Sequence, residues 1–283
     1  MPAVDPTANP TAAEPILTAD GLVRRFNGLV AVDVDHLEVP RGRITALIGP
    51  NGAGKTTTFN LLAGFDRPDE GRWSFDGRDI HHLPAHRIAR LGMVRTFQLT
   101  RVLGRLSVLD NMLLGAGDQP GEQLRRALLP WTWRAARAEA TERAHELLAR
   151  FTLDAKAGDL AASLSGGQRK LLEMARALMA RPTLLMLDEP MAGVNPALTQ
   201  SLLDHVLALR DEGITVLFVE HDMHVVKHIA DHVIVMADGR VIAEGAPREV
   251  LTDDRVVDAY LGSHHDTDLR QIIAARAAER SAS

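Results

Sequence analysis

Short runs of apolar or alternating residues, separated by turn residues, mark the strands expected in this chain. The expected strands cover residues 17–26, 29–39, 44–48, 184–187 and 215–219. The runs 44–48 and 184–187 are almost entirely apolar, which is typical of strands buried on both faces of a sheet. Helical patterns follow at about 56–63 and 197–210. Because strands and helices alternate, we predict a parallel sheet with crossover helices.

Two further stretches predict antiparallel hairpins. Residues 70–80 contain an Asp-Gly dipeptide at position 76, and a second one at position 238 lies between the short runs 232–236 and 240–243. Asp-Gly flanked by apolar runs is a strong hairpin signal. The first of these hairpins is expected at the edge of the amino-terminal lobe.

The middle and the two ends of the chain differ in character from the strand-rich regions. Helical patterns dominate between about 86 and 181, so we expect a helical subdomain there. The folded domain is expected to cover 16–262. Residues 1–15 mix Pro, Ala, Thr and acidic residues, which predicts a disordered extension and no secretory signal. Residues 263–283 predict a polar tail with a short helix over 269–280.

Composition narrows the classes of function. The chain has 283 residues, of which 46% are hydrophobic, enough for a full core. A formal net charge of -5 gives no support to a broad basic surface, so no nucleic-acid partner is expected. The absence of cysteine excludes a disulfide and a thiolate zinc site. Every apolar run is shorter than the roughly 20 residues that span a bilayer, so a membrane role needs a partner.

A glycine-rich loop follows the expected strand 44–48 and precedes a helix. It reads Gly49-Pro50-Asn51-Gly52-Ala53-Gly54-Lys55-Thr56 and matches the pattern G-x-x-x-x-G-K-[ST]. Glycines let the backbone wrap an anion, and the positive end of the following helix adds to the attraction. We expect Lys55 at the outer phosphates of ATP and the Thr56 hydroxyl on Mg²⁺. A plain surface turn is the alternative, which the preceding strand disfavours.

Two acidic residues end the expected strand 184–187. Asp188 and Glu189 lie at its carboxyl edge, where ligands gather in open parallel sheets. We expect Asp188 to hold the Mg²⁺ shell and Glu189 to polarise the water that attacks the terminal phosphoryl group. Taken alone, two acids after an apolar run are more often a helix start or a solvated turn. The phosphate loop upstream favours the metal site.

A second glycine-containing loop directly precedes the helical run 169–180. It reads Leu164-Ser165-Gly166-Gly167-Gln168. A serine, two glycines and a helix N-terminus form another anion-binding surface, in which Ser165 also caps the helix. The loop resembles the LSGGQ signature of the ATP-binding cassette (ABC) ATPases. In that family the signature of one subunit covers the nucleotide held by another, so the resemblance implies a second ATP-binding subunit. An ordinary helix cap is the alternative when the loop is taken alone.

The resemblance covers nearly all of 16–262 and implies the fold class. That class is α/β, a P-loop NTPase of the ABC ATPase type, with a parallel-sheet core, an antiparallel β subdomain and a helical subdomain. Gln98 resembles the Q-loop glutamine that touches magnesium and the attacking water. His221 resembles the switch histidine, whose expected role is to contact the terminal phosphate and to orient the water of Glu189. Together with Lys55, these residues form the catalytic set that the resemblance implies.

The resemblance also implies contacts with the base and across the subunit boundary. Phe26 matches the aromatic residue that stacks on adenine, although a phenylalanine at a strand end is usually part of the core. The run Ala192-Gly193-Val194-Asn195 matches the D-loop of the family, with Asn195 where many relatives carry aspartate. The expected nucleotide contacts are therefore Phe26, the loop from Gly49 to Thr56, Thr57, Ser165, Gly166, Gly167, Gln168 and Asn195.

Finer features resemble one branch of the family, the ATP-binding subunits of branched-chain amino-acid importers. The segments that carry this likeness are 57–60, 64–65, 94–98, 129–137, 191–196, 220–223 and 259–262. The chain departs from the branch at Gly166, where a tyrosine or another residue is common. The likeness implies a transmembrane permease partner and a peripheral location on the cytoplasmic side of the cell membrane.

Several alternatives stay open at this point. Urea importers and lipopolysaccharide-export ATPases share parts of the same pattern, and a soluble ABC ATPase without a permease is a further class. Trp131 and Trp133 fit either a partner or membrane contact or ordinary helix packing. The helix expected over 269–280 fits a regulatory or a solvated role.

Overall fold

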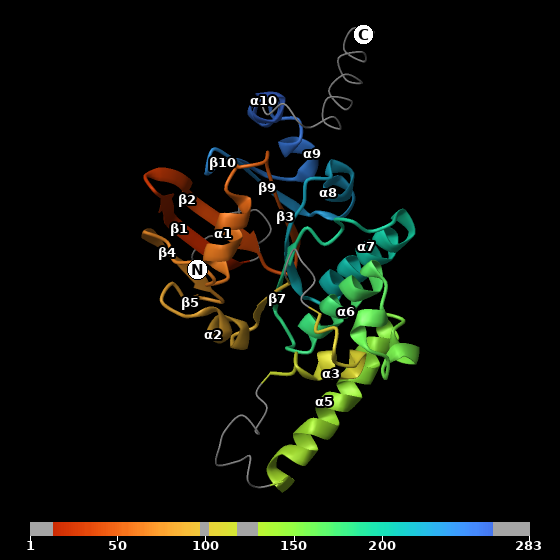
Figure 1. The fold of residues 1–283 in the computed structure, drawn as a ribbon. Helices are drawn as coiled ribbons and strands as arrows, with labels where there is room; N and C mark the ends of the chain where they lie inside the picture. Colours follow the sequence, from red (N-terminus) through yellow and green to blue (C-terminus); the bar gives the residue numbers. More distant parts are fainter. Residues whose placement is uncertain (1–13, 97–101, 118–129, 263–283) are drawn as a thin grey trace, which may run out of the picture.

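Two β-sheets organise the fold (Figure 1). The structure is a computed structural model that describes residues 14–96, 102–117 and 130–262. Gln98, the tail 263–283 and nearly all of the expected extension 1–15 lie outside the described residues, as do the side chains of Trp131 and Trp133.

The smaller sheet has four antiparallel strands in the order β2-β1-β4-β5. They are β1 (Pro15–Phe26), β2 (Leu29–Pro40), β4 (Glu70–Phe75) and β5 (Arg78–Asp79). The hairpin predicted around position 76 is confirmed, because Asp76 and Gly77 form the turn with φ angles of 51° and 71°. β1 begins at Pro15, the last residue of the expected extension.

The larger sheet is parallel except at one edge and has the order β10-β9-β3-β8-β7-β6. Its strands are β3 (Ile44–Ile48), β6 (Met93–Arg95), β7 (Leu184–Asp188), β8 (Thr215–Val219), β9 (His232–Ala237) and β10 (Arg240–Gly245). Only β10 runs antiparallel to its neighbour, β9, among the pairs of this sheet. Every residue of β3, β7 and β8 is buried, as their apolar sequences predict.

Helices join the strands and cover both faces of the larger sheet (Figure 1). The α-helices are α1 (Lys55–Leu62), α2 (Ala85–Arg90), α3 (Val108–Leu113), α5 (Pro130–Arg150), α6 (Gly166–Leu178), α7 (Pro196–Asp211), α8 (Met223–Ile229), α9 (Pro247–Val250) and α10 (Asp254–Gly262). Two short 3-10 helices, Asp154–Lys156 and Ala161–Ser163, connect α5 to α6.

The parallel sheet separates two hydrophobic clusters. Successive side chains of a strand point to opposite faces. On one face, Leu185 and Leu187 of β7 pack in a cluster with α6, α7, α8 and the helical lobe. On the other face, Leu184 and Met186 pack with α1 and the antiparallel sheet. The helices α1 and α6 therefore lie on opposite faces of the same sheet.

Strand β6 is the main difference from the expected organisation. It lies inside the range 86–181, for which we expect mainly helices, and it pairs with β7 from Met93 to Arg95. Three residues between helical patterns are too few to show the period of a strand. The helical lobe therefore starts after β6, at α3.

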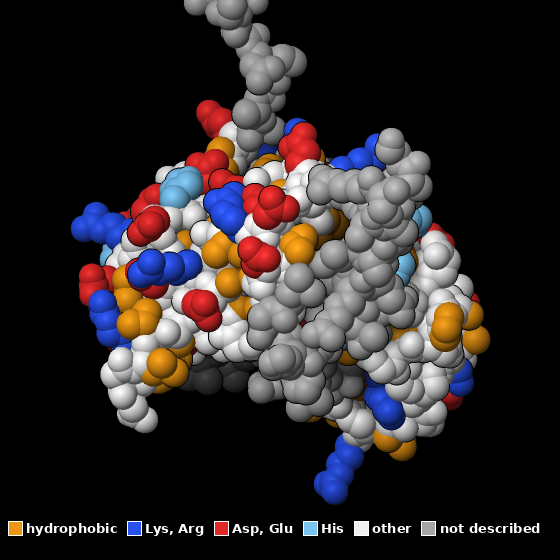
Figure 2. Space-filling model, turned by 90° about the horizontal axis from the view of Figure 1, so that it is seen from above, with side chains coloured by type: hydrophobic (Ala, Val, Ile, Leu, Met, Phe, Trp, Pro, Cys, Tyr) orange, Lys and Arg blue, Asp and Glu red, His pale blue; other side chains and the backbone are white. Residues whose placement is uncertain are grey.

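The surface carries charges of both signs. Lys and Arg side chains are interspersed with Asp and Glu on the face shown in Figure 2, with hydrophobic side chains scattered between them. Among the helices that the structure describes, none combines the length and the apolar character needed to cross a membrane.

Candidate active site

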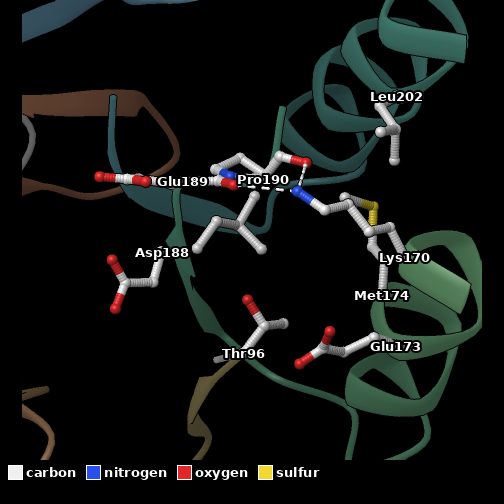
Figure 3. A pocket seen from close by; sticks show the side chains of 9 residues that line it. Thr96, Lys170, Glu173, Met174, Asp188, Glu189, Pro190 and Leu202 are labelled. Carbon is white, nitrogen blue, oxygen red and sulfur yellow. Dashed lines mark hydrogen bonds between the residues drawn. The ribbon is translucent and has the colours of Figure 1, made fainter. Parts of the chain in front are cut away.

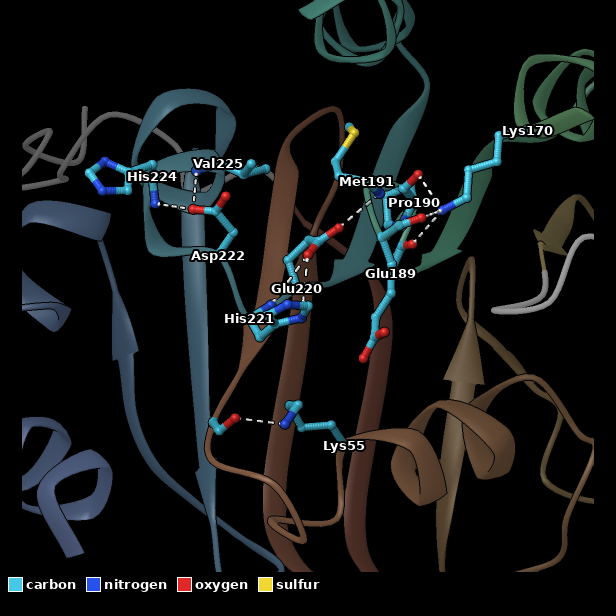
Figure 4. Close-up of polar contacts among 12 residues, drawn as sticks. Lys55, Lys170, Glu189, Pro190, Met191, Glu220, His221, Asp222, His224 and Val225 are labelled. Atoms are coloured by element: carbon cyan, nitrogen blue, oxygen red, sulfur yellow. Dashed lines mark hydrogen bonds and ion pairs between the residues drawn. The ribbon is translucent and has the colours of Figure 1, made fainter. Parts of the chain in front are cut away.

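The carboxyl ends of neighbouring parallel strands bring the expected site residues together (Figure 4). β8 lies between β3 and β7 in the sheet. The phosphate loop follows β3, Glu189 follows β7, and His221 follows β8. Figure 4 shows Lys55, Glu189 and His221 at this one edge. The topology of the sheet thus joins residues that are far apart in the sequence.

The phosphate loop is a tightly packed turn that needs glycine at particular positions. Gly49, Gly52 and Gly54 have φ angles of 149°, 83° and 94°, which other residues rarely adopt. A Cβ atom added to Gly49 would lie 2.1 Å from the carbonyl oxygen of Met236, and one added to Gly54 would lie 2.5 Å from that of Ala31. The loop is therefore pressed against β9 and β2, and its shape is set by this packing.

Lys55 lies within the phosphate loop and begins α1. Its Nζ donates hydrogen bonds to the carbonyl oxygens of Gly49 at 2.6 Å and Pro50 at 3.0 Å, and the side chain is buried. The N-cap of α1 is Gly54, which provides no side-chain acceptor for the first N–H groups of the helix. An anion in the loop would therefore meet both an ammonium group and an uncapped helix N-terminus.

Oxygen ligands for a metal ion lie beside the loop. The Asp188 carboxylate is buried, and its Oδ2 accepts a hydrogen bond from Arg95 Nη2 at 2.7 Å. Arg95 also donates to Asn60 Oδ1 at 2.6 Å, so its guanidinium group holds the carboxylate in one orientation. Thr56 is exposed on the first turn of α1, and Thr57 beside it is half-buried. Carboxylate and hydroxyl oxygens are the hard ligands that Mg²⁺ prefers, so this donor set fits the expected ion.

Glu189 has an unusual backbone conformation directly after β7. Its φ angle is 46°, in the left-handed region that few non-glycine residues occupy. The conformation is held by a hydrogen bond from the Glu189 N–H to the Val219 carbonyl oxygen at 3.0 Å. The carboxylate is half-buried at the edge of the sheet. Backbone strain of this kind concentrates at functional sites, which agrees with the role expected for Glu189.

Glu220 supports the turns that carry Glu189 and His221. It is almost fully buried, and its carboxylate accepts the backbone N–H groups of Met191 at 3.0 Å and His221 at 3.3 Å. Burial raises the pKa of Glu220, and these two hydrogen bonds act in the opposite direction. The His221 ring is exposed, with Nδ1 3.8 Å from the Glu220 carboxylate. The histidine is thus anchored through its backbone while its ring stays accessible.

The signature loop forms the exposed N-terminus of α6. Ser165 Oγ accepts the Gln168 N–H at 3.2 Å, and Gln168 Oε1 accepts the Ser165 N–H at 3.0 Å. This capping box confirms the cap predicted at Ser165. Ser165 and Gly166 are exposed, whereas Gly167 is half-buried. Since α6 and α1 cover opposite faces of the sheet, the two helix ends that are expected to bind anions belong to different surfaces of one chain.

The other expected contacts have different settings. Phe26 is 43% exposed at the end of β1, with the Arg24 guanidinium carbon 4.6 Å from its ring centroid. A core role for Phe26 is therefore excluded, and its ring is accessible for stacking. Asn195 Oδ1 accepts the Leu198 N–H at 2.9 Å and caps α7. Gln98 lies outside the described residues.

Comparisons with known proteins decide the family. Residues 32–192 match the family model described as ABC transporter. The chain belongs to the ABC transporter ATP-binding family. Residues 240–266 of this ABC cassette also match a model described as branched-chain amino acid ATP-binding cassette transporter.

Individual relatives of the cassette agree with this assignment over most of its length. The probable branched-chain amino acid transport ATP-binding protein LivG of Archaeoglobus fulgidus is 44% identical over 248 residues, covering 88% of this chain and 96% of that protein. The high-affinity branched-chain amino acid transport ATP-binding protein BraF of Pseudomonas aeruginosa is 41% identical over 252 residues, covering 88% of this chain and 99% of that protein. A solved structure described as the ADP conformation of an ATP-binding cassette of an ABC transporter has a TM-score of 0.77 at 38% identity, covering 88% of this chain and 100% of that one.

Family membership establishes the general activity of the chain. The ABC cassette binds nucleotide and is an ATPase. The predicted fold class is confirmed by the two sheets and by the likeness to a solved cassette.

Sequence analysis did not find three polar residues of this ABC cassette that support the site. They are Arg95, Lys170 and Glu220. Figure 3 shows Lys170 reaching from α6 toward Glu189 and Pro190, above a small pocket that Asp188 also lines. Arg95 and Glu220 lie within the recognised segments 94–98 and 220–223, but no local pattern shows what their side chains contact.

Proposed function

We propose that this ABC cassette is the ATP-hydrolysing subunit of a branched-chain amino-acid importer and drives a separate permease. The observation that carries the proposal is the juxtaposition of Lys55, Asp188, Glu189 and His221 at one sheet edge, with the signature loop on another surface. The names of LivG and BraF and the match over 240–266 support the substrate class.

The proposed machine is a clamp of two cassettes, either two copies or two related chains. ATP lies between the phosphate loop of one subunit and Ser165 to Gln168 of the other, and Phe26 stacks on its adenine. The separation of α1 and α6 on opposite sheet faces supports this arrangement, because each surface is then offered to a different nucleotide. Asn195 lies beside the boundary between the subunits. Closure therefore requires nucleotide, and the shared phosphates hold the halves together.

Hydrolysis is assigned to the residues at the carboxyl edge. When bound by Asp188 and Thr56, with Gln98, Mg²⁺ would neutralise phosphate charge. The Glu189 carboxylate takes a proton from water as the water oxygen bonds to the γ-phosphorus and the bond from that phosphorus to the bridging oxygen breaks. His221 contacts the terminal phosphate and orients the water. ADP and phosphate no longer join the halves, so the clamp opens.

The permease is proposed to dock beside the helical lobe. A cavity of about 280 Å³ opens between β6, α3 and α6. Its lining includes Val94, Arg95 and Thr96, which directly precede the segment that contains Gln98, and Leu114, which is 57% exposed. A concave, largely apolar surface whose lining ends two residues before Gln98 in the sequence suits a partner that must sense the nucleotide. The cassette then lies peripherally on the cytoplasmic side of the membrane.

Reconstitution tests the function. The cassette, its permease and its binding protein are assembled in vesicles, and ATP-dependent uptake of leucine, isoleucine and valine is compared with uptake of urea. Uptake of the three amino acids, lost with Lys55→Ala, is the expected result. Uptake of urea alone would assign the cassette to the related urea importers, and ATP turnover that no permease changes would point to a soluble ATPase.

A further inference from the structure

Lys170 joins the signature helix to the segment that carries Glu189. Its Nζ donates hydrogen bonds to the backbone carbonyl oxygens of Glu189 at 3.2 Å and Pro190 at 2.9 Å (Figures 3 and 4). A third hydrogen bond goes to the carbonyl oxygen of Ala192 at 2.5 Å. Hydrogen bonds from an ammonium group are stronger than those between neutral groups. One side chain of α6 therefore fixes the backbone directly after β7.

Burial and charge suit Lys170 to this contact. The side chain is half-buried, and burial lowers its pKa, while the nearby carboxylates Glu220, Glu173 and Glu189 act in the opposite direction. Carbonyl oxygens that accept from one ammonium group must keep their relative positions. Glu189 therefore carries both a carbonyl oxygen held by Lys170 and the carboxylate expected to act on the water, and its φ of 46° lies in the left-handed region.

A second contact ties the far end of the same segment to α6. A Cβ atom added to Gly167 would lie 1.8 Å from Leu198 Cδ2, so the backbone of the signature loop packs directly on the first turn of α7. Asn195 caps that turn through the Leu198 N–H. The segment 189–198 is thus attached to α6 at its start by Lys170 and at its end by the contact between Gly167 and Leu198.

The start of α6 is itself a rigid unit. The capping box of Ser165 and Gln168 satisfies two backbone N–H groups. Lys170 follows Ser165 by five residues, about 7.5 Å along a helix axis. A displacement of the signature loop is therefore passed along α6 to the carbonyl groups that Lys170 holds.

We propose that Lys170 is a positioning residue that couples the signature loop of a subunit to the Glu189 of the same subunit. The inference rests on the proposed clamp, in which that signature loop touches the ATP held by the partner. ATP in the partner's phosphate loop then sets the Glu189 backbone through α6 and Lys170, so filling one site raises the rate of hydrolysis at the other. The two sites become cooperative through one side chain.

The test compares variants of the full-length chain. Lys170→Met removes the charge and the donors at similar length, Lys170→Arg restores both, and Lys227→Met removes an exposed lysine of α8 as a matched control. ATP hydrolysis is measured against ATP concentration, and the affinity of the isolated chain for ADP is measured by titration. The affinity for ADP shows whether the phosphate loop and the fold are intact, and its measurement does not require the partner subunit.

The expected results distinguish a positioning role of Lys170 from a general loss of folding or nucleotide binding. For Lys170→Met, kcat falls about 10- to 100-fold, as expected for loss of hydrogen bonds to a charged group. The Hill coefficient falls to about 1, while ADP affinity changes less than about threefold. Lys170→Arg recovers most of the turnover and the cooperativity, and Lys227→Met behaves as the wild type.

Other outcomes are equally decisive. Wild-type kcat and Hill coefficient in Lys170→Met would overturn the coupling role, and so would a loss of kcat matched by a loss of ADP affinity in a folded protein. If Lys170→Met fails to fold, Lys170→Gln, which keeps an amide donor without charge, replaces it under the same criteria. A wild-type chain that neither dimerises with ATP nor hydrolyses it cooperatively would instead refute a clamp made of two copies of this chain.

Discussion

The N-termini of α1 and α6 are both expected to bind phosphate, yet they are built in different ways. The α1 end has no side-chain cap, lies in a loop packed against β2 and β9, and carries the buried Lys55. The α6 end is exposed and already capped by Ser165 and Gln168. A serine hydroxyl that accepts an N–H still has its own proton to donate.

The difference indicates a division of work. The α1 end is a cradle that one chain completes by itself and that can hold nucleotide alone. The α6 end is a finished surface that can add a hydroxyl and further N–H groups to an anion presented from outside. In the proposed clamp, ATP therefore joins two subunits because the α1 end of one holds it and the α6 end of the other covers it.

The largest expected effect comes from removing hydrolysis while leaving both helix ends intact. Glu189→Gln should lower ATP turnover about 100- to 10,000-fold, because the water loses its general base. ATP should then hold the subunits together, which size-exclusion chromatography with and without ATP can detect. Near-normal turnover in this variant would contradict the role of Glu189.

Changes at Ser165 should affect only the α6 end, which is expected to cover the ATP of the other subunit. Ser165→Asp keeps a good helix cap but presents a negative charge to the phosphates. We expect ATP-driven dimerisation to weaken about 100-fold or more, because facing like charges cost several kcal/mol. The affinity of the single chain for ADP should stay the same. Ser165→Ala is the matched variant, which loses the cap and about 1 kcal/mol of stability without adding charge.

A change at Lys55 should first affect nucleotide binding at the α1 end. Lys55→Ala should weaken ADP and ATP binding to the single chain about 10- to 100-fold, since a charged hydrogen-bond donor to phosphate is lost. Isothermal titration of nucleotide into the purified variant measures the effect. Unchanged affinity would show that the loop backbone alone holds the phosphates.

The smallest expected effects concern the free energy of unfolding. Substitution of one glycine at each helix end should change it by different amounts. Gly54→Ala should lower the free energy of unfolding by about 2 kcal/mol or more, because its φ is 94° and the new Cβ would meet the Ala31 carbonyl oxygen at 2.5 Å. Gly166 has no neighbour within 4 Å of an added Cβ, so Gly166→Ala should raise stability by less than about 1 kcal/mol. Urea denaturation measures both, and equal effects would mean that the two ends are packed alike.

Much of this arrangement could be predicted where the information is local. The strands β3 and β8 have the expected bounds because apolar residues fill them, and the glycine-rich motifs are contiguous in sequence. β6 was missed because three residues show no period. The partners of Arg95 and Lys170 could not be predicted, since they are groups on other elements that only the tertiary fold brings near.

A mixing experiment tests the shared site most directly. Lys55→Ala and Ser165→Asp are purified as separate chains, and ATP hydrolysis is measured for each alone and for an equimolar mixture. A mixed pair contains one intact phosphate loop facing one intact signature loop, so the mixture should hydrolyse ATP faster than the sum of the two variants. A mixture that equals that sum would contradict a nucleotide site shared between two copies of this chain.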